Sequence, residues 1–293
     1  MDILCFGEIL WDTFDDGKQP GGATMNVAFH LAQQGANASF ASRIGDDAAG
    51  NKLIKYLKKS GLYNSDLIQI DEKRPTCEVT VHLDEKQQAT YTIPQPVSWD
   101  NIKTKKPLTQ NAKAADAVVF GSLVCRDATS RDTLLNLLGE TKALTVFDVN
   151  LRAPHYTLST IETLAARANV VKMNEEEANL LLSRTKGDLK DKILEFHSKY
   201  HADTICVTRG ENGAIVWHDH EFYEHPGYAA NVVDTVGAGD AFLATFTIGV
   251  LNKLPMQQVL ERACAIGAFV TSQRGANPLY VEGIVGLASK LCN

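Results

Sequence analysis

The sequence repeats one pattern: a short run of apolar residues, then a loop, then a segment whose apolar residues recur at helical spacing. In the first repeat the apolar run covers residues 3–10, and the helical spacing over 26–34 stops at Gly35, a residue type that commonly ends helices. The pattern returns four times. Each apolar run is followed by its helical segment: 38–44 by 51–59, 117–120 by 131–138, 144–149 by 161–167, and 170–173 by 175–182. Strands that are apolar along their whole length are buried on both faces. The repeats therefore predict an α/β fold, with a parallel sheet that carries helices on both faces.

Two neighbouring segments, 76–83 and 88–93, depart from this pattern because apolar and polar residues alternate in them. They flank the turn residues 84–86 and are predicted to form a small antiparallel β-hairpin. Appendages at the carboxyl ends of parallel strands are where α/β folds bind ligands, so this hairpin is a candidate lid. An edge hairpin without a function fits the same pattern.

The last third of the chain combines a second predicted hairpin, 214–217 with 221–223, and two strongly apolar helices at 241–251 and 257–270. No low-complexity tract or linker divides the 293 residues. We therefore expect a single domain over the whole chain, with a lid insertion around 76–93.

Charge and composition disfavour several classes of partner. With 29 Lys and Arg against 35 Asp and Glu, the formal net charge is −6, so nucleic acid is not an expected partner. No stretch approaches the ~18 uninterrupted apolar residues of a membrane-spanning helix, so a membrane partner is not expected either. The six cysteines are scattered without a CxxC pair, which predicts reduced thiols and a cytoplasmic protein.

Residues 234–242, Asp-Thr-Val-Gly-Ala-Gly-Asp-Ala-Phe, carry the strongest chemical signal. Gly237, Ala238 and Gly239 allow close backbone approach, and the apolar helix behind them offers unpaired N–H groups at the positive end of its dipole. Such a loop binds anions, yet Asp240 would repel a phosphate unless it served as a proton acceptor. The combination suggests phosphoryl transfer to a hydroxyl group. Taken alone, it also fits an ordinary helix start with an acidic first turn.

The same segment resembles the second signature of the ribokinase-like, or PfkB, family of carbohydrate kinases. The family's first signature is similar to Gly-Gly-Ala-Thr-Met-Asn-Val-Ala at 21–28, followed by Gly35 and by Ile-Gly-Asp-Asp-Ala-Ala-Gly at 44–50. The resemblance extends from residue 3 to about 278. It implies a ribokinase-like fold and an enzyme that uses ATP and Mg²⁺. Asp240 is then the catalytic base, and the N–H groups of 236–239 stabilise the transferring phosphate.

Two further segments resemble the nucleotide side of these kinases. Asn-Glu-Glu-Glu at 174–177 is similar to the family's Asn-x-x-Glu motif. An amide and a carboxylate three residues apart share one helix face, so we expect Glu177 to hold Mg²⁺ through water and Asn174 to reach the phosphates. The same pair is typical of helix capping. Residues 207–214 resemble the family's strand-to-turn segment beside the nucleotide, which assigns Thr208 and Gly210 to ATP.

The acceptor side resembles the fructokinase branch. Asp12, together with Gly22 and Asn26, is expected to bind sugar hydroxyls, because carboxylate and amide groups suit them. Asp-Val-Asn-Leu-Arg at 148–152 is similar to the Asp-x-Asn-x-Arg of fructokinases. This assigns Arg152 to the sugar or to the transferring phosphate, with a structural salt bridge as the alternative.

The resemblance also implies a K⁺ site near Asp234, Val236 and the turn at Gly275. Here the chain departs from the family, since Gly-Ala-Asn-Pro-Leu at 275–279 lacks the serine that several members have after this turn. One side-chain ligand of K⁺ is therefore missing, which leaves K⁺ dependence open. In relatives the lid pairs between subunits, which implies a homodimer.

Other nucleotide-binding classes lack their motifs in this chain, because neither a P-loop nor a Gly-x-Gly-x-x-Gly after the first strand occurs. His218, His220 and His225 lie close in sequence without an organised partner set, so no metal site is expected there.

The predicted function is that of a kinase that phosphorylates a primary hydroxyl of D-fructose, with the pKa of Asp240 near an ordinary carboxylate value. One alternative is a kinase for ribose, 2-keto-3-deoxygluconate or a nucleoside. The other is a sugar-binding regulator without catalysis.

Overall fold

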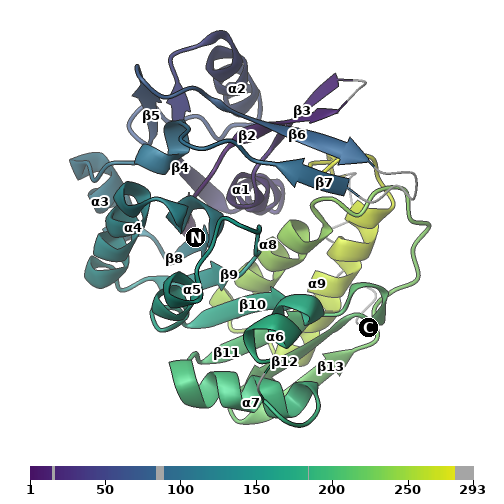
Figure 1. Ribbon diagram of the computed structural model, residues 1–293. Coiled ribbons are helices and arrows are strands. Elements are labelled where there is room, and N and C mark those ends of the chain that lie inside the picture. The colour runs from purple at the N-terminus through teal and green to yellow at the C-terminus, as the bar shows by residue number, and fades with distance from the viewer. Residues whose placement is uncertain (15–16, 84–88, 184, 281–293) are drawn as a thin grey trace.

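The computed structural model describes residues 1–14, 17–83, 89–183 and 185–280. Nine strands form the main sheet in the order β13-β12-β11-β10-β9-β8-β1-β4-β5 (Figure 1). Their bounds are β1 Asp2–Phe6, β4 Asn37–Gly45, β5 Ile68–Asp71, β8 Ala117–Gly121, β9 Leu144–Asp148, β10 Val170–Asn174, β11 Thr204–Thr208, β12 Ala214–His218 and β13 Glu221–His225. The strands from β11 to β5 are parallel, and β12 and β13 add an antiparallel edge. The predicted α/β class is confirmed.

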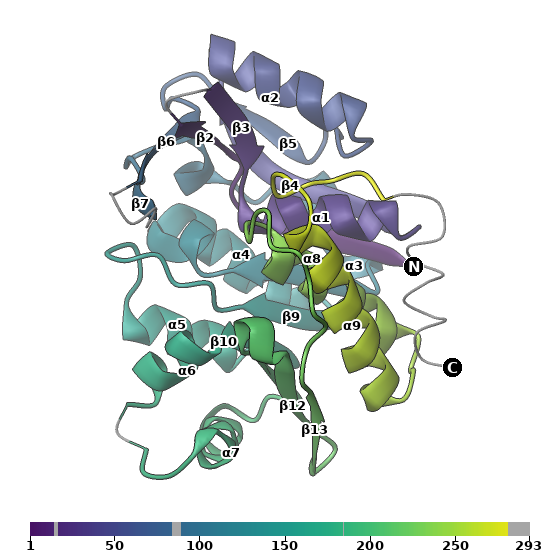
Figure 2. The same cartoon turned by 90° about the vertical axis from the view of Figure 1, so that its right-hand side faces the viewer.

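Helices cover both faces of this sheet (Figure 2). One face carries α1 Ala23–Gln33, α2 Ala48–Lys59, α8 Ala238–Leu251 and α9 Met256–Thr271. The other carries α3 Lys106–Ala114, α4 Ala128–Glu140, α5 Leu158–Ala165, α6 Glu175–Leu181 and α7 Leu189–Tyr200. Strand β1 shows why the strands are apolar throughout. Ile3 and Cys5 pack into the first layer, whereas Leu4 and Phe6 pack into the second.

A second, four-stranded sheet forms the lid in the order β3-β2-β6-β7. Its strands are β2 Leu10–Phe14, β3 Gly17–Gly21, β6 Cys77–Leu83 and β7 Ala89–Thr92. The hairpin predicted around 76–93 corresponds to β6 and β7, and its turn at 84–86 lies outside the described residues. The lid is larger than predicted, because the apolar run 3–10 contains the end of one strand and the start of another. Two of its pairings are antiparallel, and β2 pairs with β6 in parallel.

Within the described residues, no helix has the length and apolar character needed to cross a bilayer. Five of the cysteines are buried and unpaired, and Cys292 lies outside the described residues.

Candidate active site

The N-terminus of α8 is left without a side-chain cap by the glycine loop that precedes it. Gly237 has a φ of 80°, and a Cβ there would come within 2.5 Å of the Ala276 carbonyl oxygen, so only glycine fits. One detail of the prediction is wrong: the Val236 N–H donates to Asp234 Oδ1 at 3.0 Å and is not free for a phosphate. The Ala238 N–H also has a partner, the Thr235 carbonyl oxygen at 3.4 Å. An anion would therefore bind the remaining N–H groups in the first turn of α8, where an uncapped helix fits a phosphate.

Asp240 lies in this first turn and contacts α1. Asn26 Nδ2 donates to Asp240 Oδ2 at 2.8 Å. The other oxygen, Oδ1, has no hydrogen bond to the described residues that would prevent it from meeting a substrate hydroxyl. A base on one side and an anion-binding helix terminus on the other is the arrangement that phosphoryl transfer requires.

The pKa of Asp240 is raised to about 7, whereas an ordinary value was predicted. Burial is the main cause, and the negative charge of Asp148 adds to it. The hydrogen bond from Asn26 and the charges of Lys172 and Arg152 lower the pKa but do not cancel the effect of burial. The prediction considered only the helix dipole, which lowers the pKa of Asp240, and did not include the carboxylate of Asp148, which raises it. A pKa near 7 suits a general base.

Lys172 was missed by the sequence analysis, although it lies beneath the site. Its Nζ contacts Asp148 Oδ1 at 3.0 Å, and both side chains are buried. A Cβ on Gly239 would lie 3.2 Å from the same Nζ, so the ammonium group also approaches the glycine loop. Burial favours the neutral amine, but the carboxylates of Asp148, Glu177 and Asp240 outweigh it and raise the pKa of Lys172. A lysine inside a strand that is otherwise apolar is the signal that could have found it.

Asn174 and Glu177 form a reciprocal cap at the start of α6. Asn174 Oδ1 accepts from the Glu177 N–H, and Glu177 Oε2 accepts from the Asn174 N–H, both at 2.8 Å. Glu177 Oε1 also accepts from the Leu151 N–H at 2.7 Å. Each carboxylate oxygen keeps a lone pair that can accept from water, which fits a hydrated Mg²⁺. The Asn174 amide nitrogen stays available to an acceptor. Capping and the proposed nucleotide role are therefore compatible.

Thr208 lies beside Asn174, because the two residues pair at the ends of β11 and β10. Gly210 follows with a φ of 58° and opens a short 3₁₀ turn. The structure thus brings the predicted nucleotide residues to one edge of the sheet. Outside that edge, His218 binds Thr204 and His225 binds Gly227, so the three histidines do not converge.

The acceptor residues come from the lid, from the start of α1 and from the loop after β9. Asp12 lies on β2 against Gly21, where a Cβ would come within 2.2 Å of the Asp12 carboxylate. Burial raises the pKa of Asp12 to about 6, and the charge of Arg152 opposes this shift. Arg152 is exposed and makes no ion pair within 4.0 Å among the described residues. The structural salt bridge is therefore not what holds Arg152.

Glu8 is a second residue that the sequence analysis left without a role. Gly22 precedes α1 and offers no side chain; its φ is 118°, and a Cβ there would come within 2.4 Å of the Glu8 carbonyl oxygen. Glu8 supplies the missing cap, because its Oε1 accepts from the Ala23 N–H at 3.0 Å. Its Oε2 is buried without a hydrogen-bond partner in the described part of the chain, and burial raises its pKa.

The three residues assigned to K⁺ meet at one carboxylate. Asp234 Oδ2 accepts from the Gly275 N–H at 3.0 Å, and Asp234 Oδ1 accepts from the Val236 N–H. Asp234 thereby joins the loop before α8 to the turn after α9. Remaining carboxylate lone pairs and nearby carbonyl oxygens are ligands that suit a hard cation.

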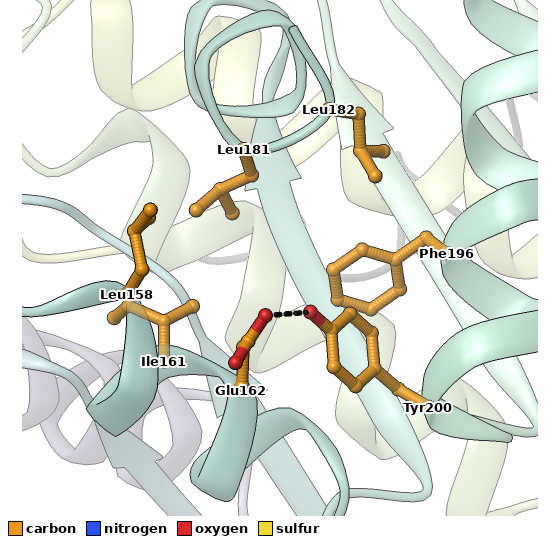
Figure 3. Close-up of a pocket in the computed structure, with 7 residues that line it drawn as sticks. All are labelled: Leu158, Ile161, Glu162, Leu181, Leu182, Phe196 and Tyr200. Carbon is orange, nitrogen blue, oxygen red and sulfur yellow. Dashed lines mark hydrogen bonds between the residues drawn. The ribbon is translucent and has the colours of Figure 1, made fainter. Parts of the chain in front are cut away.

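A separate small hollow lies between α5, α6 and α7 (Figure 3). Its volume is about 30 Å³, far below the several hundred Å³ of small-molecule sites. The one carboxylate in it, Glu162, accepts from the Tyr200 hydroxyl at 3.1 Å and pairs with Lys199. None of the predicted site residues lines this hollow, so it is not the active site.

Comparisons with known proteins agree with this geometry. Residues 3–282 match the model of the pfkB family carbohydrate kinases. The fructokinase of Escherichia coli is 28% identical over 88% of this chain and 87% of that protein. An uncharacterized sugar kinase of Pyrococcus horikoshii, solved in complex with ATP, superposes with a TM-score of 0.81 at 26% identity over 94% of each chain.

Two more distant structures share the fold. A fructokinase of Xylella fastidiosa with bound ATP has a TM-score of 0.87 at 21% identity, covering 100% of this chain and 99% of that one. An aminoimidazole riboside kinase of Salmonella enterica has a TM-score of 0.80 at 21% identity, over 98% and 99% of the two chains. The nearly complete family match and the assembled site lead to one conclusion: this chain belongs to the pfkB family of carbohydrate kinases and is a sugar kinase.

Proposed function

We propose that the enzyme transfers the γ-phosphoryl group of ATP to a primary hydroxyl of D-fructose. The observation that carries the reaction is the Asp240 carboxylate, which is bound to Asn26 on one oxygen and lies in the first turn of the uncapped helix α8. The fructokinase relative and the Asp-x-Asn-x-Arg segment at 148–152 support fructose as the acceptor.

Asp240 acts as the general base. Its free Oδ1 accepts the proton of the sugar hydroxyl as that oxygen attacks the γ-phosphorus. The bond from phosphorus to the leaving oxygen of ADP then breaks. Negative charge on the transferring group is stabilised by the N–H groups and the dipole of the first turn of α8, with Gly237, Ala238 and Gly239 allowing close approach. Asp12, Gly22 and Asn26 hold the acceptor, and Arg152 lies close enough to influence both Asp12 and Asp240.

On the nucleotide side, Asn174, Thr208 and Gly210 bind ATP. Glu177 accepts hydrogen bonds from water molecules around Mg²⁺. When bound, Mg²⁺ supplies positive charge that neutralises the phosphates. K⁺ would be held by the Asp234 carboxylate and by backbone carbonyl oxygens at Val236 and Gly275.

The lid excludes water from the transferring phosphate, because water would otherwise compete with the sugar hydroxyl. Its order leaves β3 and β7 as edge strands, and natural proteins cover such edges. A homodimer that pairs through the lid would cover them. The five unpaired cysteines support a reducing, cytoplasmic location.

Release of ADP from Mg-ATP tests this function over a panel of sugars, with fructose, ribose and 2-keto-3-deoxygluconate among them. We expect fructose-dependent turnover that Asp240→Asn reduces by several orders of magnitude, with ATP affinity little changed. Asp66→Asn is the matched control, because Asp66 is exposed and lies on a loop outside the site.

Turnover with another sugar would keep the mechanism and replace fructose as the acceptor. ATP binding without turnover on any acceptor would favour the regulator. Unchanged kcat in Asp240→Asn would show that Asp240 is not the base.

A further inference from the structure

Asn277, in the turn after α9, touches the acceptor side of the site although it lies 251 residues from Asn26 in the chain. Asn277 Nδ2 donates to Asn26 Oδ1 at 2.8 Å. Asn26 Nδ2 in turn donates to Asp240 Oδ2, also at 2.8 Å. The three side chains form a relay in which both amide groups point their N–H toward the carboxylate.

We propose that Asn277 is a positioning residue for phosphoryl transfer, which fixes the Asn26 amide with its N–H directed at Asp240 and so keeps that carboxylate ready to accept the sugar proton. This inference rests on the proposed role of Asp240 as the base. Asn277 itself touches neither the reacting atoms nor a group that we assign to the substrates, except Asn26, so it acts through Asn26.

The two ends of a side-chain amide have the same shape and opposite hydrogen-bond character. Turned by 180°, the Asn26 side chain would place its carbonyl oxygen against Asp240, where carbonyl and carboxylate repel each other. The NH₂ group of Asn277 favours the other orientation, because it needs an acceptor and meets Asn26 Oδ1. Hydrogen bonds in series also polarise one another, so the bond to Asp240 gains strength from the bond behind it.

Asn277 is held in place from two sides. Ala276, its neighbour, lies against Gly237 of the phosphate loop, and the Ala276 carbonyl oxygen is 2.9 Å from His30 Nε2 on α1. The Tyr280 hydroxyl meets His30 Nδ1 at 3.0 Å on the other side of the turn. The turn therefore has a fixed position relative to both α1 and α8, which a positioning role requires.

Asn277 also interacts with Tyr56 of α2. Burial raises the pKa of Tyr56, and a side-chain hydrogen bond with Asn277 opposes this shift. That contact is longer than the one to Asn26, because neither Asn277 Oδ1 nor the Tyr56 hydroxyl has a partner within 3.5 Å in the described part of the chain. The 2.8 Å bond to Asn26 is therefore the tighter of the two contacts.

The charged groups that face Asp240 come from three neighbouring segments. Asp148 on β9 raises its pKa, while Lys172 on β10 and Arg152 after β9 lower it. The hydrogen bond from Asn26 on α1 also lowers it. Loss of the oriented Asn26 N–H therefore shifts the pKa of Asp240 upward, because the other three groups remain unchanged.

The test is the pH profile of kcat/KM for the sugar between pH 5.5 and 9, measured for Asn277→Leu and Asn277→Asp. Neither side chain can donate to Asn26 Oδ1. We expect the acidic limb to move up by about one pH unit, so that kcat/KM falls about tenfold at pH 6.5 and about twofold or less at pH 9. The shift is larger in Asn277→Asp, since a carboxylate favours the turned Asn26 amide. Leu279→Ala is the control, because Leu279 is in the same turn and is 76% exposed.

A second measurement tests whether the effect of Asn277 on the pH profile passes through Asn26. In an Asn26→Ala background, Asn277→Leu should no longer move the acidic limb, since the group that it orients is gone.

An unchanged acidic limb in a folded Asn277→Leu or Asn277→Asp variant would overturn the proposal, and so would a loss of kcat/KM that is equal at every pH. The Asp240→Asn variant distinguishes a failure of the Asn277 proposal from a failure of the proposed role of Asp240 as the base. If Asp240→Asn is inactive and the Asn277 variants keep the parent profile, the relay alone is wrong.

Discussion

At the residue scale, Asp240, the carboxylate proposed as the base, opposes folding above the pKa of an unfolded Asp. Its pKa is about 7 in the folded chain, against about 3.9 for an unfolded Asp, mainly because burial disfavours the charge. Between these two values the folded state holds a proton that the unfolded state has lost. Stability from this group therefore falls as pH rises from about 4 to about 7, and the loss is complete above pH 7.

Asp240→Asn should consequently stabilise the protein while it abolishes activity. Three pKa units correspond to about 4 kcal/mol, but part of the side chain reaches solvent, so we expect about 2 kcal/mol at pH 8. Urea unfolding at pH 8 and at pH 5 measures the free energy of unfolding, and the gain in stability of the variant should be smaller at pH 5. Asp66→Asn should change neither value. A variant that is less stable at pH 8 would contradict the role of burial.

The buried pair of Lys172 and Asp148 supports a second prediction. Lys172→Met leaves the Asp148 carboxylate buried without its partner, which typically costs about 3–5 kcal/mol. The double variant Lys172→Met/Asp148→Asn should recover much of that loss, because no charge remains unpaired. Lys113→Met is the matched control in a pair that is about half exposed, and it should cost at most about 1 kcal/mol. Equal losses in the buried and exposed pairs would contradict this account.

The proposed K⁺ site has one carboxylate, Asp234, and backbone groups as its ligands. We expect kcat to be higher in K⁺ than in tetramethylammonium, which is too large for the site. Asp234→Ala should remove the difference. Equal rates of the parent enzyme in the two salts would show that the site does not bind K⁺.

At the scale of elements, the proposed lid is a sheet built from strands of two distant parts of the chain. Its β2 brings Asp12, whereas β6 and β7 extend beyond it. Cys77 and Val79 anchor β6 in the main core, so the outer part of the hairpin can be removed without opening that core.

Replacing residues 82–90 by an Asn-Gly turn should raise ATP hydrolysis relative to sugar phosphorylation, because water then reaches the phosphate. The ratio of ADP released to sugar phosphate formed measures it, and a ratio that stays at one would show that the hairpin does not exclude water. ATP affinity is the internal control, since the nucleotide residues lie on the main sheet.

The elements that sequence patterns predict well are those buried on two faces or along a wide stripe. Strands β1, β4, β8, β9 and β10 and helices α1, α8 and α9 are of this kind. Helix α3 buries only Leu108 and Ala112, so its pattern is faint. The boundary between β1 and β2 is hidden because Ile9 and Leu10 are apolar and buried although they lie outside β1.

At the scale of the whole molecule, the motifs assigned roles to Asn26 and Asp240 but did not predict that the two side chains would touch. They meet because each motif opens a helix, α1 or α8, on the same face of the sheet, and the two helices pack together. The relay through Asn277, the cap from Glu8 and the pair of Lys172 and Asp148 depend on contacts between segments far apart in sequence. No local pattern records such contacts.

The order in which the chain is made has a bearing on when it can act. Strand β1 precedes both of its neighbours, β4 and β8, in the chain, and it lacks the second neighbour until residue 121 has been added. The carboxylate and its relay need residues 26, 240 and 277, and 251 positions separate the first of these from the last. A chain that stops within α9 would thus contain every described strand of both sheets and Asp240, yet lack the turn that carries Asn277. By the relay proposed above, the enzyme would reach its full rate near neutral pH only after the turn that carries Asn277 has been added.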